Sequence, residues 1–158
     1  MTTAETRYDS RPETYQHISS VRTKLQRIAF GLLERGRVHD ASKLVEPELA
    51  VFDEYTPKLK ASTYGSDEYA SFLEGMREGL AHHYKVNDHH PEFRDGTLGW
   101  MSLMQLTEML CDWMAACERH DDGDIRRSIE INAERFGYGD EIKTLLYNTV
   151  EALEQGWV

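Results

Sequence analysis

The chain has 158 residues, with 18 basic and 28 acidic side chains and a formal charge of −10. This length fits one domain, and the acidic excess argues against a surface that binds nucleic acid or anionic lipid by charge alone. No apolar run approaches the ~20 residues that span a membrane, and the N-terminus lacks the basic start and apolar stretch of a secretory signal, so we expect a cytoplasmic protein.

We expect a polar, loosely held segment over residues 1–12, followed by one helical domain over residues 13–158. The first helix should span about residues 13–35 and end at Gly36, because glycine commonly follows the last turn of a helix. Apolar residues recur along it at alternating intervals of three and four, namely Ile18, Val21, Leu25, Ile28 and Leu32. This spacing places them in one stripe, which is typical of an amphipathic helix.

Five more helices follow from the same kind of apolar spacing and from residues that cap helix N-termini. We expect them to begin near Pro47, at Ser66 or Asp67, near Trp100, at Asp124 and at Asp140. Pro57 should stop the first of them, and the stretch 86–99, which holds a proline and two glycines, should be a loop. No segment alternates apolar and polar residues as a half-buried strand does. The predicted fold is therefore all-α, a single bundle of about six helices.

Histidines are concentrated in the first 90 residues, and several of them stand beside acidic residues. The six in this region are His17, His39, His82, His83, His89 and His90. Mixed imidazole and carboxylate groups bind Zn²⁺, Mn²⁺, iron or Co²⁺, and carboxylates also bind Mg²⁺. A bound divalent ion would also supply the positive charge that an anionic substrate needs in an acidic protein.

The phase of the expected helices distinguishes among these histidines. His17 lies four residues before Val21 and borders the apolar stripe, where it is either a hydrogen-bonded histidine at the edge of the core or a metal ligand. His83 continues the apolar phase of the third helix and His82 does not, so His83 should face inward. An inward histidine at a helix end needs a polar partner, and a metal ion is one such partner.

Glu108 and Asp112 stand one turn apart on a single helix face, and the immediate neighbours of Asp112 are apolar. A buried carboxylate without a partner is costly. Either both acids pair with Arg or Lys at the surface, or Asp112 binds a metal ion and Glu108 orients another ligand.

The ordered set of His17, the pair His39-Asp40 and the distant Asp112 resembles the pattern of the HD-domain superfamily of metal-dependent phosphohydrolases. The segment His39-Asp40-Ala41-Ser42-Lys43 is similar to the His-Asp-x-x-Lys variant of branches that bind two metal ions. The segment 83–92, HYKVNDHHPE, also resembles a group of small phage and bacterial proteins. The resemblance extends over about residues 15–118.

This resemblance implies one or two divalent ions in a helical domain. Its metal ligands would be His17, His39, Asp40 and Asp112, and for a second ion His83 with His89 or His90. Asp40 would bridge the two ions.

The resemblance also implies a phosphohydrolase that uses metal-activated water on a nucleotide or another small phosphate ester. Lys43 would bind a phosphate oxygen, Arg94 or Arg119 would add a planar pair of donors, and Glu108 would orient a ligand or accept a proton. One alternative is a di-iron oxygenase on the same scaffold, and another is a metal-binding helical protein without catalytic activity. Whether the chain forms a homo-oligomer is left open.

Overall fold

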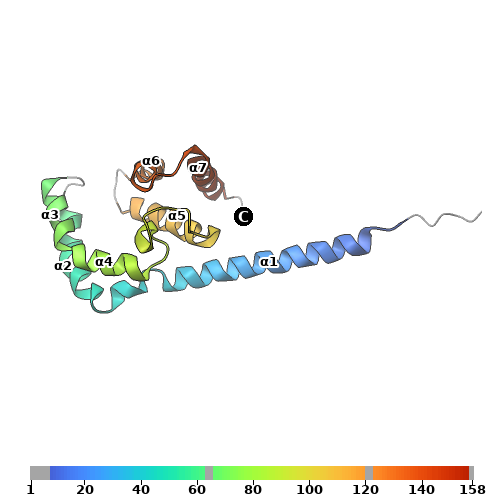
Figure 1. Ribbon diagram of the computed structural model, residues 1–158, viewed down its shortest axis with the longest axis horizontal. Helices are drawn as coiled ribbons and strands as arrows, with labels where there is room; N and C mark the ends of the chain where they lie inside the picture. Colours follow the sequence, from blue (N-terminus) through green and yellow to red (C-terminus); the bar gives the residue numbers. More distant parts are fainter. Residues whose placement is uncertain (1–7, 63–65, 120–122, 157–158) are drawn as a thin grey trace, which may run out of the picture. The chain divides into compact units, whose positions relative to one another are not determined.

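A computed structural model describes residues 8–62, 66–119 and 123–156. The described residues form seven α-helices and two short 3-10 helices and contain no strand, which confirms the all-α class with seven α-helices instead of about six (Figure 1). The chain divides into two compact units, residues 1–37 and residues 38–158, and each is described by itself. In the described part of the chain, no helix has both the length and the apolar character needed to cross a membrane.

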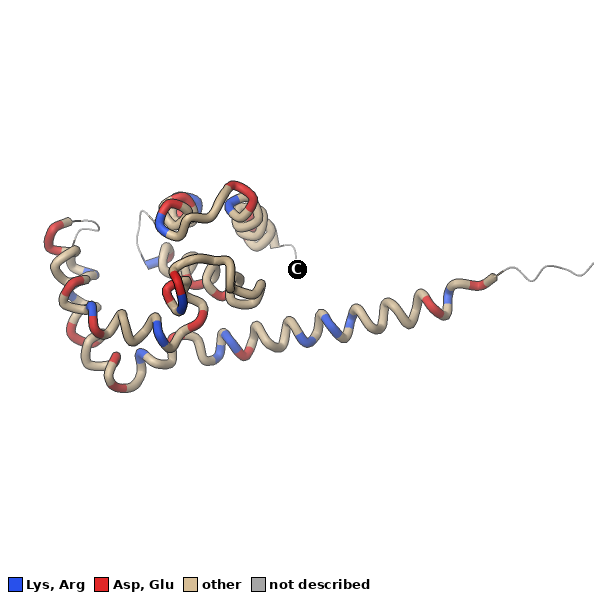
Figure 2. Tube along the Cα trace, viewed as in Figure 1, with Lys and Arg blue, Asp and Glu red and all other residues tan. Residues whose placement is uncertain are grey.

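Helix α1 (Arg11–Val38) makes up most of the first unit. It begins inside the segment expected to be loosely held, of which residues 1–7 lie outside the described residues. It also continues through Gly36, because this glycine keeps a helical backbone without the positive φ of a helix-ending residue. The apolar stripe is present, and among the described residues of this unit no second helix covers it. Lys and Arg recur along α1, as Figure 2 shows.

Helix α2 (Glu48–Ala61) is the first α-helix that lies wholly in the second unit. The prediction that Pro57 ends this helix is wrong. Pro57 lies inside the helix, which continues for four more residues. Proline lacks the N–H that would bond one turn back, but the residues after it can still take helical dihedral angles. Proline therefore removed one hydrogen bond here without ending the helix.

The third expected helix is divided into α3 (Asp67–Gly75) and α4 (Arg77–Val86), which accounts for the seventh helix. Ser66 caps α3 by accepting a hydrogen bond from the N–H of Tyr69, as the sequence predicted. At the break, α3 packs so closely on α2 that a Cβ added at Gly75 would overlap the Tyr55 ring. His83 lies in the last turn of α4.

Helices α5 (Leu103–Cys117), α6 (Ile125–Phe136) and α7 (Asp140–Glu154) contribute the main apolar core. The buried residues at its centre are Leu110, Ile129, Leu146 and Val150. Ser102 and Gln105 form a reciprocal cap at the start of α5, and Asp124 caps α6 through two backbone N–H groups, as expected for this residue. The core thus fixes α5, whose opposite side carries Glu108 and Asp112.

Candidate metal centre

The chain turns sharply where α1 gives way to the short 3-10 helix η1 (Ala41–Leu44). Asp40 takes a left-handed conformation, with φ 54° and ψ 17°, which Asp adopts more readily than most residues. In a continuing helix, the side chains of His39 and Asp40 would point about 100° apart around the axis. The turn instead lets both side chains enter one cluster of polar groups.

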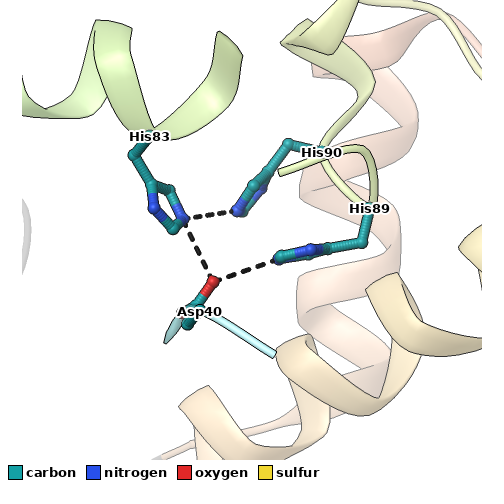
Figure 3. A group of neighbouring side chains, drawn as sticks. All are labelled: Asp40, His83, His89 and His90. Atoms are coloured by element: carbon teal, nitrogen blue, oxygen red, sulfur yellow. Dashed lines mark hydrogen bonds and ion pairs between the residues drawn. The ribbon is translucent and has the colours of Figure 1, made fainter. Parts of the chain in front are cut away.

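Three histidines lie close to Asp40 (Figure 3). His83 is near the end of α4, and His89 and His90 are in the loop between α4 and the 3-10 helix η2 (Pro91–Phe93). The Nε2 atom of His83 lies 3.2 Å from Asp40 Oδ1 and 2.9 Å from His90 Nε2. The Nε2 atom of His89 lies 3.4 Å from the same Asp40 oxygen. His83 and His89 are each about 2 % exposed. We call Asp40, His83, His89 and His90 the three-histidine group.

Side-chain amides hold the loop that carries two of these histidines. Asn87 donates to Ser42 Oγ at 2.8 Å and to the carbonyl of His83 at 2.9 Å, which joins the loop to η1 and to α4. Gln105 donates to Asp88 Oδ2 at 2.7 Å, which joins the same loop to α5. The histidines are therefore held by contacts with three separate elements.

The three-histidine group fits a divalent ion. With bonds of about 2.0–2.1 Å, neighbouring ligands of a tetrahedral ion are about 3.3 Å apart, and the three separations of 2.9, 3.2 and 3.4 Å lie around that value. Two atoms that point into the group, Asp40 Oδ1 and His89 Nε2, are buried and have no hydrogen-bond partner among the described residues. Buried polar atoms are normally paired, and a cation held between these two atoms would pair both of them.

The protonation states of the group also suit metal binding. Burial favours the neutral form of Asp40, but the His83 imidazole and the Lys43 ammonium outweigh burial and hold the pKa of this carboxyl well below its usual range. Burial, reinforced by the neighbouring His89 and His83, lowers the pKa of His90 to about 2. Burial likewise lowers the pKa of His89. At neutral pH Asp40 is therefore ionised and His89 and His90 are neutral, and these are the forms that bind a cation.

A second candidate group shares Asp40 with the first. His39 Nε2 lies 3.6 Å from Asp40 Oδ2 and 3.5 Å from Asp112 Oδ1, and the three residues could hold an ion together. The Nζ atom of Lys43 lies 2.6 Å from the same Asp40 oxygen. Since an ammonium group already partners Asp40 Oδ2, the need for a cation is greater at the three-histidine group.

Two further carboxylates lie behind the histidines and contact their Nδ1 atoms. Glu108 Oε1 lies 2.9 Å from His39 Nδ1 and 3.3 Å from His89 Nδ1. Glu48, at the start of α2, is fully buried and lies 2.9 Å from His83 Nδ1. Of the two roles expected for Glu108, its contacts favour orienting the histidines.

A family model described as a family of unknown function, DUF5662, matches residues 6–156. The chain belongs to this family. No curated protein and no solved structure matched it. The DUF5662 match extends over nearly the whole chain and therefore includes every residue of the cluster.

In this DUF5662 member His17 belongs to the first unit, whereas every residue of the cluster belongs to the second. Helix α1 continues without a turn from His17 to Arg37, which places these residues about 30 Å apart along its axis. Arg37 is only two residues before His39. The expectation that the first helix ends at Gly36 is wrong, and the chain makes no turn between His17 and Val38.

The two expected arginines also lie outside the cluster as described. Arg94 is exposed, and its guanidinium carbon lies 5.1 Å from the centre of the Trp100 ring. Arg119 is exposed just after the end of α5, two turns beyond Asp112. Among the described contacts, neither arginine reaches the three-histidine group, and Lys43 is the cation that does contact Asp40.

Sequence reasoning missed three polar residues that support the site, Glu48, Ser42 and Asn87. Ser42 and Asn87 lie inside the two segments that were already recognised, so their hydrogen bonds could have been sought there. Glu48 stands near an expected helix start, where an acidic residue is ordinary. Its burial depends on the packing of α2 against α4 and η1, which no local pattern reveals.

Proposed function

We propose that this protein is a divalent-metal-dependent phosphohydrolase that acts on a nucleotide or another small phosphate ester. The observation that carries the proposal is that the Nε2 atoms of His83 and His89 approach one oxygen of Asp40, an ionised and largely buried aspartate, while the Nε2 atom of His90 lies beside that of His83. Two of these buried atoms, Asp40 Oδ1 and His89 Nε2, have no hydrogen-bond partner among the described residues. A divalent cation bound between them would pair both atoms.

The charge of the chain supports a cation as part of the active site. A formal charge of −10 repels a phosphate ester unless positive charge is concentrated at the site. A divalent ion would supply that charge and would lower the pKa of bound water to about 7. Lys43 adds a second positive group, since its ammonium is held at the cluster by Asp40 and by the face of the Phe52 ring, 4.7 Å away.

The side chains then take separate roles. The metal ligands are Asp40, Asp112 and the three histidines of the three-histidine group. Glu108 holds the rings of His39 and His89 through their Nδ1 atoms. Lys43 can contact a phosphate oxygen as a point charge, because its side chain is 29 % exposed and its head lies at the edge of the cluster. The resemblance to HD-domain enzymes supports this assignment through His39, Asp40 and Asp112, but not through His17.

The experiment is an assay of inorganic phosphate released from a panel of nucleotides by the purified chain with Mn²⁺, Co²⁺ or Mg²⁺. We expect release from at least one nucleotide with one of these ions, and loss of release when the ion is chelated. Release that continues unchanged in excess chelator, or no release from any nucleotide or simple phosphate ester, would contradict the proposal.

A di-iron oxygenase is the second candidate, because the two oxygens of Asp40 face two different groups of potential ligands. Such a shared carboxylate suits two neighbouring ions, and imidazole with carboxylate is a common ligand set for iron. Two tightly bound iron atoms per chain together with oxygen uptake would favour this function over phosphate release.

A further inference from the structure

A neutral histidine binds a metal ion through one ring nitrogen only, and the other nitrogen then carries the proton. An acceptor that holds this proton fixes both the tautomer and the direction in which the ligand atom points. The three-histidine group uses Nε2 of His83, so its geometry depends on what holds Nδ1 of that ring.

Glu48 occupies that position. Its Oε2 atom lies 2.9 Å from His83 Nδ1 and accepts a hydrogen bond from Ser42 Oγ at 2.9 Å. Its Oε1 atom lies 2.8 Å from Nδ1 of His82. The carboxylate therefore acts as an acceptor toward every one of these partners.

The neighbouring hydrogen bonds agree with a proton on Nδ1 of His83. The Asn87 amide nitrogen lies 2.8 Å from Ser42 Oγ, 2.9 Å from the His83 carbonyl oxygen and 2.9 Å from His83 Nδ1. The amide has only two N–H groups, and the two oxygens accept both of them. The Ser42 hydroxyl in turn donates to Glu48. Every donor in this chain of contacts thus has an acceptor, and Nδ1 of His83 is left to donate to the carboxylate.

We propose that Glu48 is a positioning residue that fixes the Nδ1–H tautomer of His83 and thereby aims its Nε2 atom at a divalent cation. The inference rests on the metal centre proposed above and adds a residue that controls it from behind. Glu48 acts on His83, whereas Glu108 acts on His39 and His89. The two carboxylates therefore control different ligands and can be tested separately.

The first test is ion affinity. Zn²⁺ and Co²⁺ binding to the full chain is measured by titration for the wild type, for Glu48→Gln and for the control Glu54→Gln, which alters an exposed acid on the same helix. We expect about a 10- to 100-fold weaker affinity in Glu48→Gln and no change in the control. Wild-type affinity in Glu48→Gln overturns the positioning role while leaving the metal centre intact. No binding by the wild type overturns both.

The second test reports the tautomer itself and would not respond to a merely structural role. Long-range ¹H–¹⁵N spectra of the zinc-loaded wild type should show His83 protonated at Nδ1 and bound through Nε2. The His83 signals should change in Glu48→Gln, while those of His39 and His89 should change in Glu108→Gln instead. Coordination of His83 through Nδ1 would overturn the proposal even if the variants fold less well.

Discussion

Asp40→Asn is expected to abolish metal-dependent phosphate release, with a loss of at least about 100-fold, because the Asp40 carboxylate faces both candidate ligand groups. Asparagine has the same shape and also tolerates the left-handed conformation at this position, so the turn itself should survive. The substitution removes the negative charge of Asp40, which attracts both the bound cation and the Lys43 ammonium. The measurement is phosphate release with Mn²⁺, together with circular dichroism to verify the helix content.

Asp53→Asn is the matched control, since Asp53 is exposed on α2 and the change in charge is the same. This control should retain wild-type activity. If Asp40→Asn were as active as the control, the reaction would not depend on the cluster at all.

Ile129→Ala should destabilise the protein by about 3 kcal/mol, because Ile129 is fully buried at the centre of the core formed by α5, α6 and α7. The truncated side chain leaves a cavity that its neighbours Leu110 and Val150 cannot fill completely. The expected decrease in the melting temperature is on the order of 10 °C. Urea denaturation followed by circular dichroism gives the free energy of unfolding directly.

Ile131→Ala provides the comparison on the same helix, where the side chain is 46 % exposed. Its effect should stay within about 0.5 kcal/mol. Equal destabilisation by the two substitutions would show that α6 does not bury the face described here.

The helix content and several helix starts were predictable because they depend on local chemistry. Ser66 and Asp124 cap their helices through hydrogen bonds to N–H groups two or three residues ahead, and such contacts are visible in the sequence. The break between α3 and α4 was not predictable, because the close approach of Gly75 to Tyr55 joins residues 20 positions apart. The predicted helix ends at Gly36 and Pro57 were also wrong, because α1 continues past Gly36 and α2 continues past Pro57.

The site was predictable where a segment held two or more of its residues together. The His-Asp pair and the His-rich segment both contribute to the three-histidine group, and the inward phase of His83 agrees with its burial. His17 was included because of its place in the ordered HD-domain pattern, and α1 continues from it to Val38 without a turn. Glu48 escaped notice because its function depends on two histidines 34 and 35 residues away.

The most direct measurement is the metal content of the purified chain after equilibrium dialysis against Zn²⁺, with His83→Ala alongside. His83 contributes its Nε2 atom to the three-histidine group, so the account predicts at least one tightly bound ion per wild-type chain and a clear loss of bound ion in His83→Ala. A wild-type chain that retains no ion, or a variant that retains as much as the wild type, would contradict the claim that these histidines and Asp40 form a metal centre.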